Sequence, residues 1–388
     1  MEAIRSRTSY SPLLVLGHIV NDMFANLLAG LLPVLIIAFG LSYLLAGFVA
    51  TVYWVTSSVI QPFLGRWFDR TQAVWLLEAG LVVNSICMSL VGISSSYALL
   101  LFLVGTAGTG TAAFHPPAFS KVIKSDGTRK GGAVGIFIAG GNVGFFLGPI
   151  VAGAVLTAYG LRGTLLLLPI GVIVAAVLLK SRVTGGNPTK HESAAGSNLP
   201  VNKSLLVLLA AITAGRSITV QTAETFLPSY FVARGDSLFV ATSLASLWLG
   251  IGVLGQLGGG FISDRVGRRL VIVTSLLVGA ALFLCFVMTS GPMSLVFLIL
   301  AGAALYASWS VIVVMSTEAA PHNVGAVSGL MLGFAIGIGG FAALGFGAIA
   351  DKVGLQAALA GFSGFAFAAG LLALLLPNVR TSSLPHPA

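Results

Sequence analysis

The residues best suited to chemistry in this chain are ionisable side chains that interrupt long apolar runs. His18 and Asp22 lie four residues apart, with Asn21 beside Asp22. On a helix this spacing places the imidazole and the carboxylate on one face. A carboxylate in an apolar environment can take up a proton near neutral pH, and a neighbouring imidazole can relay it. The spacing therefore predicts a proton site, with a structural hydrogen bond between helices as the alternative.

A second polar group lies beyond the middle of the chain, where Arg216, Gln221 and Glu224 share another apolar run. A buried Arg216 needs an anion, which Asp22 could supply as an ion pair or a substrate could supply instead. Competition between the two would couple proton binding to substrate binding, whereas a static pair would only hold helices together. Glu224 follows Arg216 by two helical turns and could be a second proton site or part of a cavity wall.

A third candidate is His115, which directly precedes the double proline Pro116-Pro117. Prolines inside a helix free backbone carbonyls for other donors. His115 could therefore act in gating or substrate binding, or only in a hydrogen bond at a kink.

The composition identifies the environment of these groups as lipid. Of the 388 residues, 57% are hydrophobic and 8% charged, where soluble domains carry about 25% charged residues. This excludes an ordinary soluble enzyme, and the 49 glycines suit close helix packing in a bilayer. The charges sit singly between apolar runs, so they indicate membrane topology and no nucleic-acid surface.

Twelve apolar runs are long enough to span a bilayer, which predicts an all-α membrane protein with twelve transmembrane helices. Most of the 20 Lys and Arg residues fall on the side shared by the termini, so we expect both termini in the cytoplasm of an inner-membrane, multi-pass protein. The long polar segment 181–203 predicts a cytoplasmic linker between an N-terminal half, 1–180, and a C-terminal half, 204–388. The predicted spans are 11–38, 43–64, 73–93, 97–121, 132–158, 163–180, 204–232, 238–262, 269–289, 293–317, 324–350 and 355–377.

The two halves match each other at a shift of 195 residues, which predicts two six-helix pseudo-repeats around a central cleft. Arg216 falls on the repeat position of Asn21, so we expect it at the depth of Asp22. The matches at this shift are Pro33 with Pro228, Gln61 with Gln256, Gly65 with Gly260, Asp69 with Asp264 and Arg70 with Arg265.

Two kinds of motif resemble those of the major facilitator superfamily. The first is a loop after the second span, repeated more fully after the eighth; the second is a glycine pattern in the fifth span that resembles the superfamily's antiporter motif. We expect the loop residues to act in gating, because an Asp near a helix end bonds donors in one conformation and releases them in another. The loop residues are Gly65, Asp69, Arg70, Gly260, Asp264, Arg265, Gly267, Arg268 and Arg269, and the fifth-span residues are Gly135, Gly144, Gly148, Pro149 and Gly153.

A narrower resemblance rests on three short strings. Residues 17–22, residues 31–33 and residues 114–116 together resemble the fosmidomycin-resistance branch of the superfamily. That resemblance implies proton-driven drug efflux and antibiotic resistance. The broader resemblance to the superfamily implies that the first, fourth, seventh and tenth spans line a central cavity.

The sequence holds no Gly-rich phosphate loop and no nucleophile elbow, so we expect neither ATP-driven transport nor an enzyme. We expect no cofactor and no metal, with protons, a small-molecule substrate and the lipid bilayer as partners of a monomer. The predicted function is a proton-coupled antiporter that exports a small drug-like or organic solute by alternating access. The alternatives are a proton-coupled symporter that imports a nutrient or organic anion, and a non-transporting sensor or scaffold.

Overall fold

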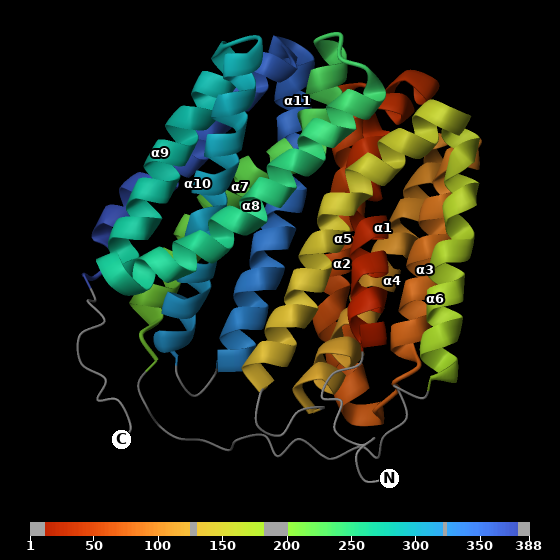
Figure 1. Ribbon diagram of the computed structural model, residues 1–388, viewed down its shortest axis with the longest axis horizontal. Helices are drawn as coiled ribbons and strands as arrows, with labels where there is room; N and C mark the ends of the chain where they lie inside the picture. The colour runs from red at the N-terminus through yellow and green to blue at the C-terminus, as the bar shows by residue number, and fades with distance from the viewer. Residues whose placement is uncertain (1–11, 125–129, 182–200, 321–323, 379–388) are drawn as a thin grey trace. The chain divides into compact units, whose positions relative to one another are not determined.

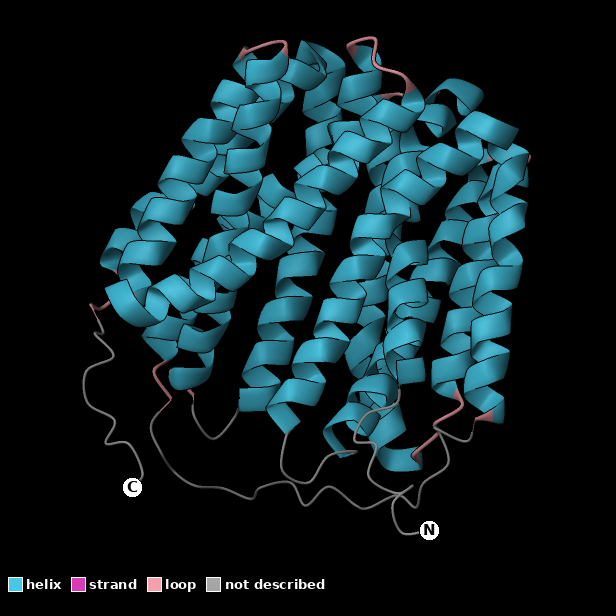
Figure 2. Ribbon diagram, in the orientation of Figure 1, coloured by secondary structure: helices cyan, strands magenta, loops and turns pink. Residues whose placement is uncertain are grey.

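The computed structural model describes residues 12–124, 130–181, 201–320 and 324–378, and this part of the chain is helical without a β-strand (Figure 2). The all-helical class predicted from the apolar runs is confirmed. The residues 182–200 of the predicted linker lie outside the described residues. The helices are α1 (Pro12–Phe39), α2 (Tyr43–Thr71), α3 (Leu76–Leu90), α4 (Tyr97–Lys124), α5 (Lys130–Tyr159), α6 (Leu168–Lys180), α7 (Lys203–Ala233), α8 (Leu238–Val266), α9 (Arg268–Met288), α10 (Pro292–Glu318) and α11 (Val324–Leu372).

The surface of these helices is apolar enough to face lipid. Large apolar side chains of these helices are exposed, for example Phe102 of α4 at 67% and Phe261 of α8 at 72%. Water would penalise such a surface, whereas hydrocarbon does not. The described residues contain 11 helical segments long and apolar enough to cross a membrane, so the chain is a multi-pass membrane protein.

The longest helix, α11, is interrupted in its middle. Gly354 has φ 81° and ψ 160°, a conformation outside the helical region that only glycine adopts readily. The predicted boundary between the last two spans, 350 to 355, falls at this residue. A single sequence position thus bends an otherwise continuous run of 49 residues.

The gating motifs are helical, which corrects their prediction as loops. Helix α2 continues to Thr71, so Gly65, Asp69 and Arg70 lie in its last turns. Likewise α8 runs to Val266 and includes Gly260, Asp264 and Arg265, while Arg268 and Arg269 begin α9. The charges end the apolar run but not the helix, because backbone hydrogen bonding persists until a residue adopts a left-handed conformation. That residue is Gln72 after α2 (φ 51°) and Gly267 between α8 and α9 (φ 97°).

The helices cluster into two compact units. The first contains α1 to α6 together with Thr225–Ser246, where α7 ends and α8 begins; the second contains the rest of α7 and α8 with α9 to α11 (Figure 1). The halves predicted at 1–180 and 204–388 stay a prediction. Each unit holds one of the two polar groups identified from the sequence, as described below.

The first unit depends on close contact between α1 and α5, which run side by side (Figure 1). A methyl group on Gly144 would overlap the carbonyl oxygen of Ile19, and one on Gly148 would lie 2.8 Å from the carbonyl oxygen of Met23. Of the other predicted motif residues, Gly153 faces Thr242 of α8, whereas a methyl group on Gly135 would meet no atom within 4 Å. Two glycines of the motif therefore let the backbones of α1 and α5 approach each other.

We predict that Gly144→Ala destabilises the protein, because the new methyl group meets backbone that cannot rotate away. Overpacking of this kind costs about 1 to 3 kcal/mol. The matched control is Gly135→Ala in the same helix, which meets open space and should leave stability unchanged or raise it by up to about 1 kcal/mol through helix propensity. Thermal unfolding in detergent measures both, and equal melting temperatures for the two variants would contradict the packing assignment.

Candidate functional site

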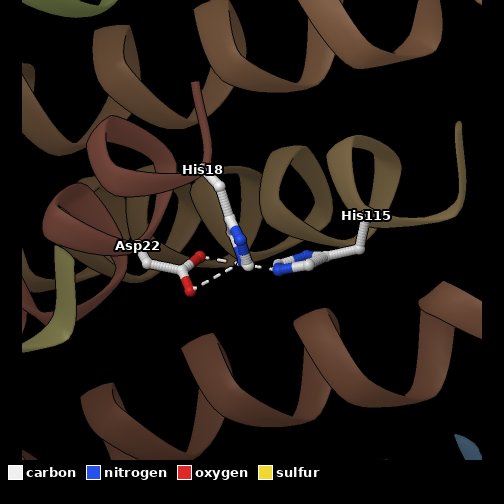
Figure 3. A group of neighbouring side chains, drawn as sticks. All are labelled: His18, Asp22 and His115. Carbon is white, nitrogen blue, oxygen red and sulfur yellow. Dashed lines mark ion pairs between the residues drawn. The ribbon is translucent and has the colours of Figure 1, made fainter. Parts of the chain in front are cut away.

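The first polar group is a buried cluster of two histidines around one carboxylate. Nε2 of His18 lies 3.2 Å from Oδ2 of Asp22, and Nε2 of His115 lies 3.5 Å from Oδ1 of the same residue (Figure 3). The side chains of His18 and Asp22 are each 6% exposed, and that of His115 is 17% exposed. Helix α1 supplies His18 and Asp22 one turn apart, and α4 adds His115. The first and third candidate groups predicted from the sequence therefore form one site.

Both imidazole rings are oriented by backbone carbonyls. Nδ1 of His18 lies 2.7 Å from the carbonyl oxygen of Phe137, and Nδ1 of His115 lies 2.9 Å from that of Thr111. A carbonyl oxygen can only accept, so each Nδ1 carries a hydrogen. Each Nε2 therefore faces Asp22 either with a lone pair, which the carboxylate repels, or with a second N–H, which it accepts.

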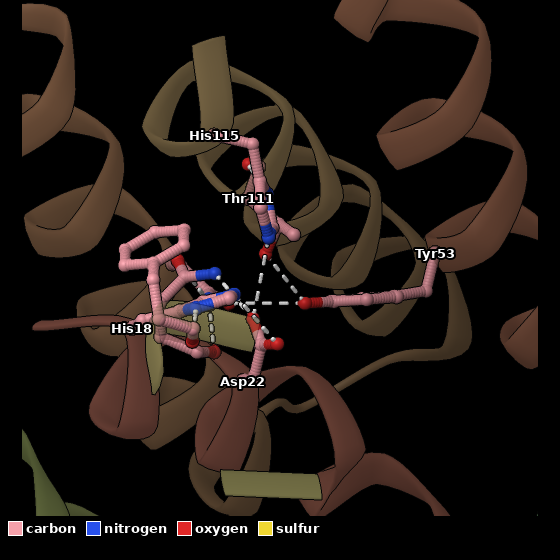
Figure 4. Close-up of polar contacts among 8 residues, drawn as sticks. His18, Asp22, Tyr53, Thr111 and His115 are labelled. Carbon is pink, nitrogen blue, oxygen red and sulfur yellow. Dashed lines mark hydrogen bonds and ion pairs between the residues drawn. The ribbon is translucent and has the colours of Figure 1, made fainter. Parts of the chain in front are cut away.

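A network of uncharged side chains holds the carboxylate in place (Figure 4). The amide of Asn21 donates to Oδ1 of Asp22 at 3.0 Å. The amide of Asn84 in α3 donates to the backbone oxygen of Asn21 at 3.0 Å. Tyr53 of α2 donates to Asn84 at 3.3 Å and shares a 2.7 Å hydrogen bond with the Thr111 hydroxyl. Four helices thus contribute to one buried network, and α5 closes it through the Phe137 carbonyl.

The walls of the cluster are aromatic and closely packed. The ring of His18 stacks on that of Phe137, with centroids 4.0 Å apart, and lies 6.0 Å from the ring of Phe114. A methyl group on Gly141 of α5 would lie 2.7 Å from both Nε2 of His18 and Oδ2 of Asp22. Gly141 therefore leaves the space in which imidazole and carboxylate meet.

This arrangement is suited to binding protons. The nitrogen and oxygen donors of His18, Asp22 and His115 lie within 4.8 Å of one another, a spacing that a metal ion could also bridge. A structural zinc site takes four protein ligands, and the described residues offer three. The absence of a metal stays a prediction; an N–H group on each Nε2 atom would satisfy the carboxylate without one.

The second polar group lies in the second unit, around Arg216 of α7. Nε of Arg216 donates to the carbonyl oxygen of Leu305 at 3.1 Å, and its Cζ lies 5.2 Å from the ring centroids of both Tyr306 and Trp309. The hydroxyl of Tyr306 donates to Oε1 of Glu224. Gln221 packs against Gly339 of α11. The three predicted residues of α7 thus lie in one unit, where Arg216 and Glu224 meet aromatic residues of α10.

The predicted ion pair between Asp22 and Arg216 stays a prediction. Each of the two groups has partners within its own unit: the two histidines surround Asp22, and two aromatic rings flank Arg216.

The gating residues meet one acidic partner that the sequence did not suggest. Arg268, at the start of α9, forms an ion pair with Glu318 at the end of α10. Arg268 also lies near enough to Asp264 for their charges to attract. Arg268 of the predicted gate therefore interacts with two carboxylates of the second unit, those of Glu318 and Asp264.

Several residues of both sites escaped the sequence analysis. Asn84 is a buried amide in the middle of an apolar run, and this was a signal that could have identified it. Tyr53, Thr111, Tyr306 and Trp309 gave no such signal, because hydroxyl-bearing and aromatic side chains are common in transmembrane helices.

An all-helical, multi-pass membrane protein with charged groups buried among its helices is typical of the class of helical membrane carriers. The match to a family model refines this class: residues 14–344 match the model of the Major Facilitator Superfamily, and the chain belongs to this family. It is therefore a transporter and not an enzyme, and the predicted resemblance to the superfamily is confirmed.

The relatives include transporters linked to drug resistance. The chain is 28% identical to the fosmidomycin resistance protein of Escherichia coli (strain K12), over 97% of this chain and 95% of that protein. It is also 28% identical to an uncharacterised transporter of the same superfamily, YfnC of Bacillus subtilis (strain 168), over 96% and 94% of the two chains.

Solved structures agree on the fold. A bacterial homologue of the human lysosomal transporter Spinster superposes with a TM-score of 0.83 at 17% identity, over 94% of this chain and 95% of that one. The nucleoside transporter NupG gives a TM-score of 0.70 at 15% identity, over 93% and 97% of the two chains.

We predict that Tyr53→Phe lowers stability, because it removes the hydroxyl that joins Asn84 to Thr111. Hydrogen bonds between transmembrane helices contribute about 0.6 kcal/mol on average and up to about 1.7 kcal/mol. We expect a loss in the upper part of this range, since the network is buried. Tyr97→Phe is the control, because Tyr97 donates to the Leu45 carbonyl at an exposed position. A smaller loss for Tyr53→Phe than for Tyr97→Phe in thermal unfolding would count against the network.

Proposed function

We propose that the chain is a proton-coupled antiporter that exports a small drug-like or organic solute by alternating access. The observation that carries the proposal is the buried cluster of His18, Asp22 and His115, in which both Nε2 atoms face one carboxylate. The printed names of relatives support export of drugs: besides the fosmidomycin resistance protein, they include a multidrug resistance protein MdtG of Dickeya zeae.

The cluster binds protons on the Nε2 atoms, and Asp22 remains the anion that holds them. With a proton on each Nε2, two N–H groups point at the two carboxylate oxygens. When a proton leaves, a lone pair of the imidazole faces the carboxylate and the local arrangement becomes unfavourable. Proton release thereby favours a rearrangement of α1 against α4, which is the coupling that alternating access requires.

The arrangement of spans follows from the interruption in α11. Gly354 divides it into two spans, which makes twelve in total and gives two halves of six. The even number places both termini on one side, and the charge bias makes that side the cytoplasm of a cell inner membrane. The linker 181–203 then joins the halves on the cytoplasmic side.

The motif residues at the ends of α2, α8 and α9 act as a gate. The ion pair between Arg268 and Glu318 lies beside Asp264, so a movement of α8 changes the charges that face Arg268. Asp69 of α2 holds the corresponding position in the first half of the sequence. These contacts would form in one conformation and break in another.

We predict that Asp22→Asn abolishes uphill transport while downhill exchange persists. The amide is uncharged and cannot replace the anion on which the proposed proton exchange depends, so the proton gradient has nothing to act on. Purified protein in liposomes with an imposed pH gradient measures this, with fosmidomycin as the first substrate tested. Asp351→Asn, at an exposed carboxylate of α11, is the control and should transport as the unaltered protein does.

The same assay separates the rival functions. Transport down the proton gradient would indicate a symporter, and no flux for any substrate would indicate a sensor or scaffold. A well-folded Asp22→Asn protein that still concentrates its substrate would remove Asp22 from the mechanism.

We predict that a cysteine at residue 196 is accessible only from the cytoplasm, because the positive charges place this segment inside. The variant Gly196→Cys is made with Cys285→Ser, since Cys285 is exposed and Cys87 is buried. A membrane-impermeant maleimide should label it only after the membrane is opened. Arg234→Cys in the same background should be labelled in intact cells. Labelling of both variants in intact cells would overturn the proposed orientation.

A further inference from the structure

Arg216 is a buried cation whose hydrogen-bonding capacity is mostly unused. The residue is 6% exposed, and its guanidinium makes one hydrogen bond, from Nε to Leu305. The rings of Tyr306 and Trp309 fix its plane from α10. A guanidinium has five N–H donors, so the four on Nη1 and Nη2 have no hydrogen-bond partner among the described residues. They form a fork held in one orientation.

Glu224, two turns further along α7, is a buried carboxylate with an unused acceptor oxygen. It is 9% exposed, and Tyr306 donates a hydrogen bond to Oε1. Its second carboxylate oxygen has no partner among the residues that the structure describes. Arg216 and Glu224 are near enough for their charges to attract, but they form no direct ion pair, and both contact Tyr306.

Two opposite charges with unused donors and acceptors are costly when they are buried without a direct ion pair. Burial removes the water that would satisfy them, and the charges gain little unless each is paired and hydrogen-bonded. The backbone bond to Leu305 and the two rings hold Arg216 where it is, and the Tyr306 hydroxyl holds Glu224. A third molecule that carries both kinds of charge would satisfy both groups at once.

We propose that Arg216 and Glu224 bind the two ends of one substrate, an organic solute with an oxyanion at one end and an ammonium or similar hydrogen-bond donor at the other. This inference rests on the proposed transport function and names its substrate class. The Nη groups take the oxyanion in a bidentate contact, and the free oxygen of Glu224 takes the donor. Tyr306 and the half-buried Trp309 offer aromatic faces to the apolar body between the two ends.

Binding to the purified full-length protein in detergent at neutral pH, with no gradient, tests the proposal. Three probes share one aromatic body: 4-(aminomethyl)benzoate carries a carboxylate and an ammonium at its opposite ends, 4-methylbenzoate carries only the anion, and 4-methylbenzylamine carries only the cation. We expect 4-(aminomethyl)benzoate to bind at least about tenfold more tightly than either single-charge probe, as titration calorimetry would measure, since each charged contact contributes roughly a factor of ten or more. This ranking requires no variant, so a folding defect cannot obscure it.

Two variants assign the ends. Glu224→Gln keeps the bond from Tyr306 but removes the charge, and should lower the affinity for 4-(aminomethyl)benzoate to that for 4-methylbenzoate while leaving 4-methylbenzoate binding unchanged. Arg216→Gln should weaken binding of both of these probes by about tenfold or more and leave 4-methylbenzylamine binding unchanged. Equal binding of the three probes, no binding of any, or an unchanged ranking in the variants would overturn the proposal. These outcomes are independent of proton coupling, which is measured separately with a pH gradient and Asp22→Asn.

Discussion

A carboxylate in the middle of a membrane-spanning helix is the constraint on which the first unit is built. Asp22 costs several kcal/mol in hydrocarbon unless other groups neutralise and hydrogen-bond it. The structure meets this cost with two imidazoles and one amide, and then with residues that fix those three. The glycines of α5 also help to stabilise the buried carboxylate, because they allow the Phe137 carbonyl to reach the ring of His18.

The buried charges of the two units are surrounded by different kinds of groups. In the first unit, the anion is surrounded by imidazoles, which as a class can bind or release a proton near neutral pH. In the second unit, the cation is an arginine, which keeps its proton under all physiological conditions and is held by rings and a backbone oxygen. A permanent cation is suited to hold an anion, and a titratable pair is suited to exchange protons. This division of roles is consistent with the proposed exchange of protons for a solute.

The sequence was sufficient to predict the helices and part of the site. Apolar runs predicted most helix ends to within a few residues, because the thickness of the bilayer fixes the length of a span. The i, i+4 spacing predicted the contact between His18 and Asp22, since it depends on one helix alone. The gate motifs were misplaced in loops because the charges of Asp69 and Asp264 end hydrophobicity and not hydrogen bonding.

Contacts between helices were beyond the sequence. The position of His115 beside Asp22, and of Tyr306 beside Glu224, depends on how α4 packs on α1 and α10 on α7. No periodicity in a single helix encodes such a neighbour. Asn84 was accessible in principle, as a lone amide in an apolar run, but its partner Tyr53 was not.

The close approach of α1 and α5 has an evolutionary consequence. Gly141, Gly144 and Gly148 each face an atom that even a methyl group would crowd. This face therefore tolerates almost no substitution. Trp309 of the second unit is only half-buried, so a different side chain there need not crowd the backbone of another helix. On the proposed assignment of substrate contacts to α7 and α10, descendants of this chain that acquire new substrates should differ mainly there, while the face that α5 turns toward α1 stays fixed.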